Sequence, residues 1–386
     1  MRSLFLGENA VSKFLKTVGD YIKKSDMLLL AVGILCTVYG IVLINSVTSS
    51  GQYVIIQIAA MILGIAMFVF FSVVDVDIFA DKSVILYILS LAFICSLIPW
   101  GVAGNSGNRA WLRFGPIGIQ PAEVVKFLFI IVLAKLMITL HDRRGLNRPL
   151  SVLAMLALFG GIFGLIVVIS ADLGSALVYF FIFVVMLFVG GLSLWWFLGG
   201  AAALAALMPL VWNRFLDEGQ KNRILAPYDP SVDPGGLGVR WQANQSALAI
   251  SSGGLTGQGL GQGKMTQSGS VPQQHTDFIF SAAGEELGFI GCAVIVALLT
   301  ILIVRCFWVA THCNYPLGML VCSGIGAMFI AQMVENIGMC LGLTPVIGLT
   351  LPFFSYGGSS ILTNYLALGI VSGIKMRSRA QRMSRY

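Results

Sequence analysis

Long apolar segments with few charges dominate this sequence and limit what it can fold into. A helix that spans a membrane needs about 20 mostly apolar residues. Windows of this kind lie at residues 27–47, 53–74, 84–102, 124–140, 150–169, 175–191, 192–212, 288–310, 316–340 and 360–374. Charged residues make up only 11% of the chain, whereas soluble domains carry about 25%. The sequence therefore predicts an all-α polytopic integral membrane protein with about ten transmembrane helices. Between the sixth and seventh windows, only a tight turn at Gly190 and Gly191 can separate the helices.

The apolar windows divide the chain into consecutive parts. The predicted parts are a cytoplasmic N-terminal segment (1–26), transmembrane helices 1–7 (27–212), a large extracytoplasmic loop between helices 7 and 8 (213–282), helices 8–10 with a broken segment (283–375) and a basic cytoplasmic tail (376–386). No cleavable signal peptide is expected, because the first apolar run is long enough to span.

Lysine and arginine predict the orientation, because they gather on the cytoplasmic side of short loops. They are frequent before residue 27, around residues 143–148 and after residue 374. Both termini are therefore predicted to be cytoplasmic and the large loop to lie outside. The net charge of +7 is explained by topology, so no nucleic-acid partner is expected.

Asp277 is the strongest candidate for chemistry. It lies where the large loop descends into an apolar run, and burial there would raise the pKa of its carboxylate towards the range of a general base. The alternative is a cap for the following helix. Glu285 and Glu286 follow closely, and one of them could hold a metal ion or orient a cation beside Asp277.

Several charged residues lie at the edges of the apolar windows, where they are costly and often functional. Glu123 and Lys126 either neutralise each other or form a site for an anionic lipid head group. Asp172 is either a helix N-cap for Ser175 or a ligand. Lys135 lies deeper, and its long side chain is predicted to extend to the cytoplasmic face.

The outer segments offer weaker signals. Trp111, beside Arg109, is either an interfacial anchor or a surface for sugar stacking and phosphate contact. Arg223, Arg240 and Lys264 suit a polyanionic substrate. Residues 241–251 have helical composition, whereas the alternating glycines at 257–263 are interpreted as a flexible linker.

Residues 342–359 are apolar but interrupted by proline and glycine. Non-helical backbone at membrane depth is tolerated where protein or a water-filled cavity covers it. We therefore expect this segment, with Glu335 and Asn336 just before it, to line a cavity open to the outside.

These motifs resemble the SEDS family (shape, elongation, division and sporulation), which includes RodA, FtsW and their sporulation relative. The matching motifs are residues 108–112, 120–123, 172–174, 241–254, 272–280, 284–288 and 336–360. Residues 336–339 and the short termini favour the RodA-like, elongation branch. Ala122, Gln273 and Gln274 depart from the family pattern, which affects substrate positioning more than activity.

The resemblance implies a peptidoglycan glycosyltransferase that polymerises lipid II at the outer face of the bacterial cytoplasmic membrane. The reaction would invert an α-linked pyrophosphate into a β-1,4 bond and release undecaprenyl pyrophosphate. The family's essential aspartate corresponds to Asp277. The implied partner is a class B penicillin-binding protein, and a divalent cation, Mg²⁺ or Mn²⁺, near Glu285 is a candidate cofactor. Substrate-binding side chains are expected among Trp111, Arg109, Glu123, Lys126, Asp172, Arg223, Gln245, Lys264, His275, Glu335 and Ser355.

Other functions remain open at this point. Lys126, Glu335 and the broken segment would also suit a lipid II flippase or another secondary transporter, which requires key charges near the membrane midplane. A scaffold for division or elongation proteins would need no placed carboxylate. A division or sporulation paralogue of the same enzyme is a further alternative.

Overall fold

The computed structural model describes residues 19–48, 50–102, 109–114, 117–214 and 216–383. The described chain is almost entirely helical. Its long helices are α2 (Met27–Val47), α3 (Gly51–Val73), α5 (Ser83–Cys95), α7 (Pro121–Arg144), α8 (Pro149–Leu165), α9 (Leu173–Val189), α10 (Leu194–Arg214), α14 (Ile279–Thr311), α15 (Pro316–Cys340) and α16 (Gly358–Met383). Each predicted apolar window falls on one of them. Within the described residues, eight helices are long and apolar enough to cross a membrane, and α9 is apolar but only 17 residues long.

Shorter elements complete the bundle. Helix α4 (Val76–Asp81) links α3 to α5, α6 (Leu97–Trp100) extends α5, and the π-helix η1 (Ile166–Ser170) extends α8. Strands β1 (Leu112–Phe114) and β2 (Ile117–Ile119) form an antiparallel hairpin before α7.

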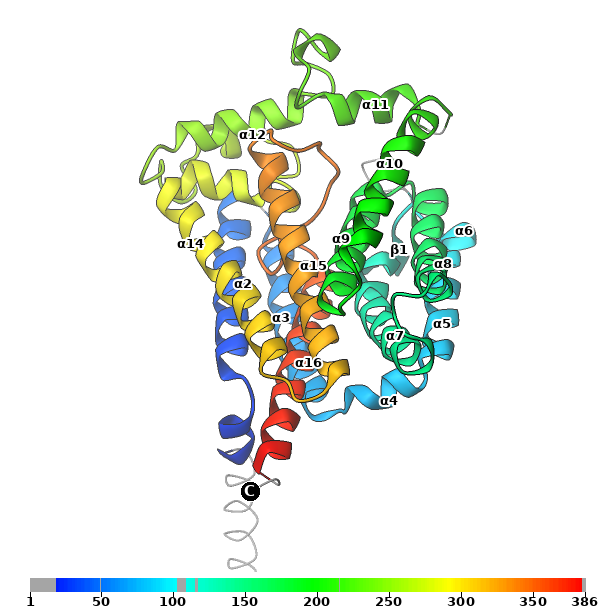
Figure 1. The fold of residues 1–386 in the computed structure, drawn as a ribbon. Coiled ribbons are helices and arrows are strands. Elements are labelled where there is room, and N and C mark those ends of the chain that lie inside the picture. The colour runs from blue at the N-terminus through cyan, green and yellow to red at the C-terminus, as the bar shows by residue number, and fades with distance from the viewer. Residues whose placement is uncertain (1–18, 49, 103–108, 115–116, 215, 384–386) are drawn as a thin grey trace, which may run out of the picture.

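The helices pack as one bundle in which α15 lies between α14 and α9, and α16 lies along α3 (Figure 1). Glycine lets the backbones of α3 and α16 come close together. A Cβ at Gly369 of α16 would lie 2.6 Å from the carbonyl oxygen of Phe68 in α3. Small residues at such contacts let helix backbones meet directly, which is how membrane helices gain packing energy.

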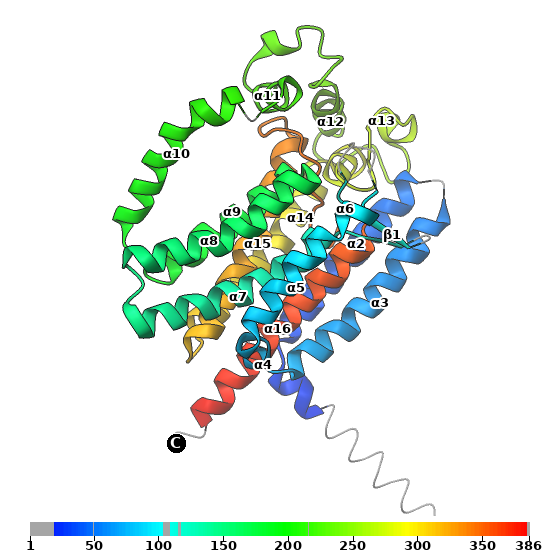
Figure 2. The ribbon, with the colours of Figure 1, turned by 90° about the vertical axis from the view of Figure 1, so that its right-hand side faces the viewer.

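Helix α10 differs from the other long helices, because none of its residues is buried. It leaves the bundle after a turn in which Gly191 has a φ of +84°, and then arches from α9 to α11 (Figure 2). A positive φ is accessible to glycine at no steric cost. The predicted tight turn between the sixth and seventh windows is therefore confirmed.

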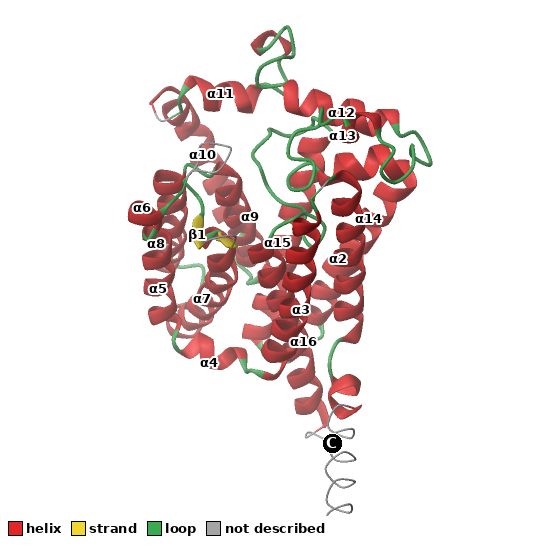
Figure 3. Cartoon of the chain, turned by 180° about the vertical axis from the view of Figure 1, so that it is seen from behind, coloured by secondary structure: helices red, strands yellow, loops and turns green. Residues whose placement is uncertain are grey.

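The segment between α10 and α14 covers one end of the bundle, opposite the C-terminus (Figure 3). We call these the loop end and the terminal end. The segment contains α11 (Glu218–Leu225), the 3₁₀ helix η2 (Pro230–Val232), α12 (Trp241–Ser252) and α13 (Lys264–Gln267). The helix expected at residues 241–251 is confirmed.

The glycine-rich segment that follows α12 is not a flexible linker, so this interpretation was wrong. Helix α14 is interrupted at Gly288, where φ is 67° and ψ is −163°. The carbonyl oxygens of Glu285 and Glu286 accept hydrogen bonds from the amides of Gln258 and Gly259, each at 2.9 Å. The two amides after Gly288 donate back to the carbonyls of residues 254 and 255, at 2.9 and 3.2 Å. The segment thus satisfies backbone groups that the break would otherwise leave without partners.

Helix α14 also begins earlier than the sequence predicted. Helix α14 begins at Ile279, so both the apolar window from residue 288 and the predicted loop boundary at 282 start too late. Glu285 and Glu286 lower the hydropathy of the first turns, although both side chains are fully buried. Apolarity alone therefore could not find this part of the helix.

Candidate active site

Asp277 lies directly before Phe278, the N-cap residue of α14, on a half-buried stretch of chain. The N-cap of α14 is Phe278, and no side chain caps this helix, so the capping alternative for Asp277 is wrong. The carboxylate faces Gly348 of the broken segment, where a Cβ would lie 3.3 Å from Oδ2 of Asp277. Among the described residues, no group donates a hydrogen bond to this carboxylate. It is free to accept a proton from a bound molecule.

The surroundings of Asp277 tune its acidity. Burial raises the pKa of Asp277 from 3.8 to about 6, and the negative charge of Asp172 adds to this rise. A catalytic base works best when its pKa lies near the working pH. The carboxylate of Asp277 therefore accepts no hydrogen bond within the described chain, and its pKa suits proton transfer near neutral pH.

Asn336 of α15 holds the backbone around Asp277. Its Nδ2 donates to the carbonyl oxygen of Asp277 at 2.8 Å and to that of Leu349 at 2.6 Å. One buried side chain thereby joins the chain before α14 to the broken segment. Two such bonds from a fully buried amide fix the separation of the two backbones.

The broken segment makes further contacts to the residues before Asp277. Ser355 Oγ donates to the carbonyl of Thr276 at 2.6 Å, and the amide of Tyr356 donates to the carbonyl of His275 at 2.8 Å. The ring of His275 packs against those of Tyr53 and Tyr356, with centroids 4.9 and 5.9 Å away, and the two tyrosine rings also contact each other. Burial lowers the pKa of His275. His275 and Ser355 thus support the chain beside Asp277.

Two supporting residues were not among the predicted site residues. Asn336 was noted only as lining a cavity, and Gln57 of α3 was not noted. Gln57 donates from Nε2 to the carbonyl of Ser355 at 3.0 Å and accepts from the amide of Gly357 at 3.3 Å. An amide side chain in a mostly apolar helix could have indicated both, because a buried group of this kind needs a partner.

Asp172 approaches Asp277 from the first turn of α9. Its Oδ1 accepts from the amide of Ser175 at 3.0 Å, so the predicted N-cap is confirmed. Its Oδ2 accepts from Gln120 Nε2 at 3.0 Å. Burial raises the pKa of Asp172, the hydrogen bonds from Ser175 oppose this, and the charge of Glu123 reinforces it. A Cβ at Gly174 would lie 3.0 Å from the carbonyl oxygen of Ile347, so this helix start packs on the broken segment.

Glu123 and Lys126 form the predicted pair on the first turns of α7. Lys126 Nζ lies 2.5 Å from Glu123 Oε1, and the two side chains are 1% and 5% exposed. Burial of both charges requires that they remain together. Lys126 is therefore held in its ion pair with Glu123. Lys135 instead reaches Asp81 of α4, at 2.8 Å.

Trp111 and Arg109 belong to the chain that forms the hairpin. The indole of Trp111 rests on Gly118, whose Cβ would lie 3.1 Å from Cε3 of the ring. The hairpin leads directly into Gln120, the partner of Asp172. Arg109 is exposed. Asn108 lies outside the described residues.

Glu285 does not fit the metal site predicted for it. Its two carboxylate oxygens accept hydrogen bonds from the backbone amides of Met265 and Thr266, at 2.7 and 2.8 Å. The carboxylate thus caps the first turn of α13 and is fully buried. The described residues contain no group of three or more histidine, cysteine, aspartate or glutamate side chains that could hold a metal ion.

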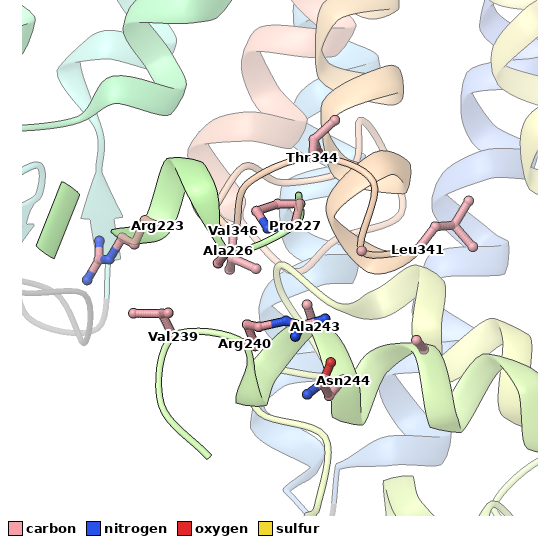
Figure 4. Close-up of a pocket in the computed structure, with 12 residues that line it drawn as sticks. Arg223, Ala226, Pro227, Val239, Arg240, Ala243, Asn244, Leu341, Thr344 and Val346 are labelled. Carbon is pink, nitrogen blue, oxygen red and sulfur yellow. The ribbon is translucent and has the colours of Figure 1, made fainter. Parts of the chain in front are cut away.

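The other predicted residues lie around the site. Glu335 is buried next to Asn336, and its Oε1 has no hydrogen-bond partner. Gln245 lies on α12, and Lys264 is exposed at the start of α13. Arg223 lines a cavity with Arg240 of the same loop (Figure 4). The structure therefore brings Glu123, Lys126, Asp172 and Asp277 into one cluster but keeps Lys264 and Glu285 outside it.

A bundle of membrane-spanning helices with a tuned carboxylate at the loop end defines a polytopic membrane protein with an acid–base site. Comparison with known proteins identifies the family. A family profile described as a cell cycle protein, of the FtsW, RodA and SpoVE type, matches residues 26–380. The chain belongs to this family and is a multi-pass protein of the bacterial inner membrane.

Individual relatives agree with this assignment. The chain is 32% identical over 326 residues to the peptidoglycan glycosyltransferase MrdB of Escherichia coli K12, covering 82% of this chain and 84% of the relative. It is 33% identical over 364 residues to the probable peptidoglycan glycosyltransferase FtsW of Trichlorobacter lovleyi, covering 90% and 92%. Among solved structures it is similar to a chain from a peptidoglycan synthase complex (TM-score 0.78, 31% identity, 92% and 99% covered). It is also similar to the rod shape determining protein RodA of Thermus thermophilus (TM-score 0.67, 28% identity, 92% and 97% covered).

Proposed function

We propose that this protein is a peptidoglycan glycosyltransferase that polymerises lipid II into glycan strands for cell-wall elongation and shape. The observation that carries the proposal is the carboxylate of Asp277, which has no hydrogen-bond donor in the described chain, faces Gly348 and has a pKa of about 6. The names of the relatives support the same activity.

The mechanism requires one base and one displacement. Asp277 accepts the proton of the acceptor 4-hydroxyl as that oxygen attacks the anomeric carbon of the donor. The bond from this carbon to the pyrophosphate oxygen breaks, and undecaprenyl pyrophosphate leaves with the electron pair. A single in-line displacement inverts an α-linked donor into a β-1,4 product, through a transition state with oxocarbenium character.

Positioning of the base depends on the groups behind it. Asn336 holds the carbonyl of Asp277, and Ser355 holds that of Thr276. Burial, reinforced by the negative charge of Asp172, keeps the pKa of Asp277 high, so the base can also hold the transferred proton. Fixed geometry of this kind lowers the barrier because little reorganisation is needed during reaction.

The leaving pyrophosphate needs positive charge more than it needs an acid. Lys126 is paired with Glu123 and is buried, so it cannot move to the pyrophosphate without leaving a buried carboxylate. Arg109 is exposed and lies two residues before Trp111. The chain then forms the hairpin that leads into Gln120, the partner of Asp172. We assign the phosphate contact to Arg109 and sugar stacking to Trp111. No step is assigned to a metal ion, because the carboxylate of Glu285 is already bound by backbone amides.

The placement of the acids favours an enzyme over a transporter. Glu123 is in the first turn of α7, Asp172 caps α9, and Asp277 precedes α14. All three therefore lie at helix ends, whereas a transporter holds its key charges near the midplane. The proposed orientation puts this end outside the cell and both termini inside. Lys375 and Arg305, which share Asp26 at the terminal end, suit the cytoplasmic side.

The proposed partner is a class B penicillin-binding protein, which would crosslink the strand that this chain polymerises. The similarity to a chain from a peptidoglycan synthase complex supports a partner of this kind. The loop helices offer a contact surface next to the segment that carries Asp277. We propose that the partner activates polymerisation by favouring the arrangement in which Asp277 faces Gly348.

The test is polymerisation of labelled lipid II by the purified protein. Asp277→Asn keeps the shape of the side chain but cannot accept a proton, so the rate should fall by roughly 100-fold or more. Asp229→Asn, in the same loop, is the control, because asparagine also caps helices and the side chain of Asp229 accepts a hydrogen bond only within its own turn, from the amide of Ser231. Adding the partner with its transpeptidase serine mutated should still raise the initial rate. Normal polymerisation by Asp277→Asn would refute the role of Asp277.

A further inference from the structure

A cavity of about 200 Å³ lies beneath the loop helices, between α11, α12 and the chain that follows α15. Small apolar groups form much of its wall, among them Ala226, Pro227, Val239, Ala243 and Val346 (Figure 4). Its polar lining consists of Arg223, Arg240, Asn244 and Thr344. An apolar wall with a few placed polar groups is typical of ligand sites.

The two arginines of this cavity carry unpaired charge. Neither Arg223 nor Arg240 forms an ion pair with an acidic side chain of the described chain. The nearby carboxylate of Asp233 is occupied by the backbone amides of Gly238 and Arg240, at 2.9 and 3.1 Å. A guanidinium presents several donors in a plane and binds carboxylate or phosphate oxygens best. The cavity is therefore suited to an anionic group attached to apolar parts.

The cavity adjoins the proposed base. Val346 lines it, and Gly348, which faces Asp277, is two residues further along the chain. Two residues span at most about 7 Å. On the other wall, Thr344 donates to the carbonyl of Glu335, directly before Asn336. A ligand that reacts beside Asp277 can thus extend one of its branches into the cavity.

We propose that this cavity binds the stem peptide of the donor substrate, and that Arg223 and Arg240 hold its carboxylates. This inference rests on the proposed function. The stem peptide branches from the same sugar ring that carries the reacting anomeric carbon, so it lies close to the base when that carbon does. Its alanine methyl groups match the small apolar wall.

The pyrophosphate is the other anionic part of the same substrate. It remains bonded to the lipid chain, which must stay in the membrane, whereas residues of the loop helices α11 and α12 form most of the cavity wall. The alanine, proline and valine side chains of the wall offer a phosphate no hydrogen bonds. The experiment must nevertheless separate the two sources of negative charge.

The experiment compares three lipid-linked disaccharides that share the same pyrophosphate. One carries the stem peptide with free carboxylates, one carries the same peptide with its carboxylates amidated, and one carries only the first amino acid, as its amide. For the unmodified protein, the KM should be lowest for the free carboxylates and roughly tenfold or more higher for the other two. The kcat should change little, because binding of this branch is equal in the ground and transition states.

The variants test which residues cause the discrimination. The double variant Arg223→Gln, Arg240→Gln should raise the KM for the free-carboxylate substrate to that of the amidated one. An unchanged kcat of this variant on the shortest substrate shows that the site is intact. Lys221→Gln, which removes the same charge from α11 outside the cavity, should leave the discrimination unchanged. An equal loss on all three substrates would mean that the arginines bind pyrophosphate, and would overturn the proposal. The same KM for all three with unmodified protein would also overturn it, whereas failure to polymerise any of them would refute the proposed function itself.

Discussion

The side-chain amide of Asn336 donates a hydrogen bond to the carbonyl oxygen of Asp277 at 2.8 Å. The backbone of Asp277, the proposed base, is therefore held by a residue of α15, a helix that lies far from Asp277 in the sequence. The same amide group holds Leu349 at 2.6 Å. This one side chain therefore joins Asp277 directly to the broken segment, and the contacts of Ser355 and Tyr356 join the residues before Asp277 to the same segment.

Loss of this contact should slow the reaction. We expect Asn336→Ala to lower the kcat roughly 10-fold to 100-fold, because it frees two buried carbonyls and lets the base shift. The KM should change much less. Asn314→Ala, which removes a single bond to the carbonyl of Ser378 at the terminal end, is the matched control. Equal kcat values for the two variants would contradict a positioning role for Asn336.

The pH dependence of the rate should report the acidity of Asp277. Because the base must be deprotonated, kcat/KM should rise about tenfold per pH unit up to a pH of about 6 and then level off. Asp172→Asn keeps the cap on α9 but removes a negative neighbour, so the rise should move to lower pH. A profile that is flat between pH 5 and 7 would exclude Asp277 as the base.

The same shift has a consequence for stability. The folded pKa of about 6 exceeds the ordinary value of 3.8, so the folded state binds this proton more tightly than the unfolded state does. The contribution of Asp277 to stability is therefore highest below pH 3.8 and is lost as the pH rises through about 6. Asp277→Asn should raise the melting temperature of the detergent-solubilised protein at pH 7 but not at pH 4. A variant that melts earlier at pH 7 would contradict this sign.

Glu285 should act on the loop and not through a metal ion. Glu285→Ala removes the cap from α13 and leaves the amides of Met265 and Thr266 buried without partners, at a cost of about 1–3 kcal/mol each. Limited proteolysis should then cut within residues 256–270 sooner, with or without a chelator. Glu218→Ala, which breaks an exposed ion pair on α11, should leave the cutting rate unchanged. If a chelator reproduced the effect of Glu285→Ala, a metal role would regain support.

The proposed orientation can be checked with single cysteines in a cysteine-free background. Ser268→Cys is exposed on the loop and should react with an impermeant thiol reagent outside intact cells. Asp142→Cys, at the terminal end of α7, should react only after the membrane is opened. Asp142 is 71% exposed, whereas Ser378 is 6% exposed and would be a poor reporter. Reversed labelling would place the acidic cluster inside the cell.

The sequence predicted those features that depend on local composition. The apolar windows indicated the long helices, the acid before an apolar run indicated Asp277, and the spacing of Glu123 and Lys126 indicated their pair. Asp172 was predicted as a cap from the serine three residues later. Each inference needed only a few neighbouring residues.

Features that depend on tertiary contacts were missed. The glycines after α12 were interpreted as a flexible linker because glycine permits many conformations. In the structure, their segment forms backbone hydrogen bonds with the interrupted helix, about 30 residues further along the chain. Glu285 resembled a metal ligand because its backbone partners, 19 and 20 residues away, carry no sequence signal. Asn336 and Gln57 are polar residues in mostly apolar helices, and each has a partner in the broken segment, Leu349 and Ser355.

The contacts that hold Asp277 also determine when the site can form during synthesis. Asn336, Ser355 and Tyr356 all follow Asp277 in the chain, so the ribosome makes them after the base. Until α15 and the broken segment have emerged and inserted, the carboxylate has nothing to face. A newly made chain therefore remains inactive through most of its biogenesis and becomes competent only when its last helices join the bundle.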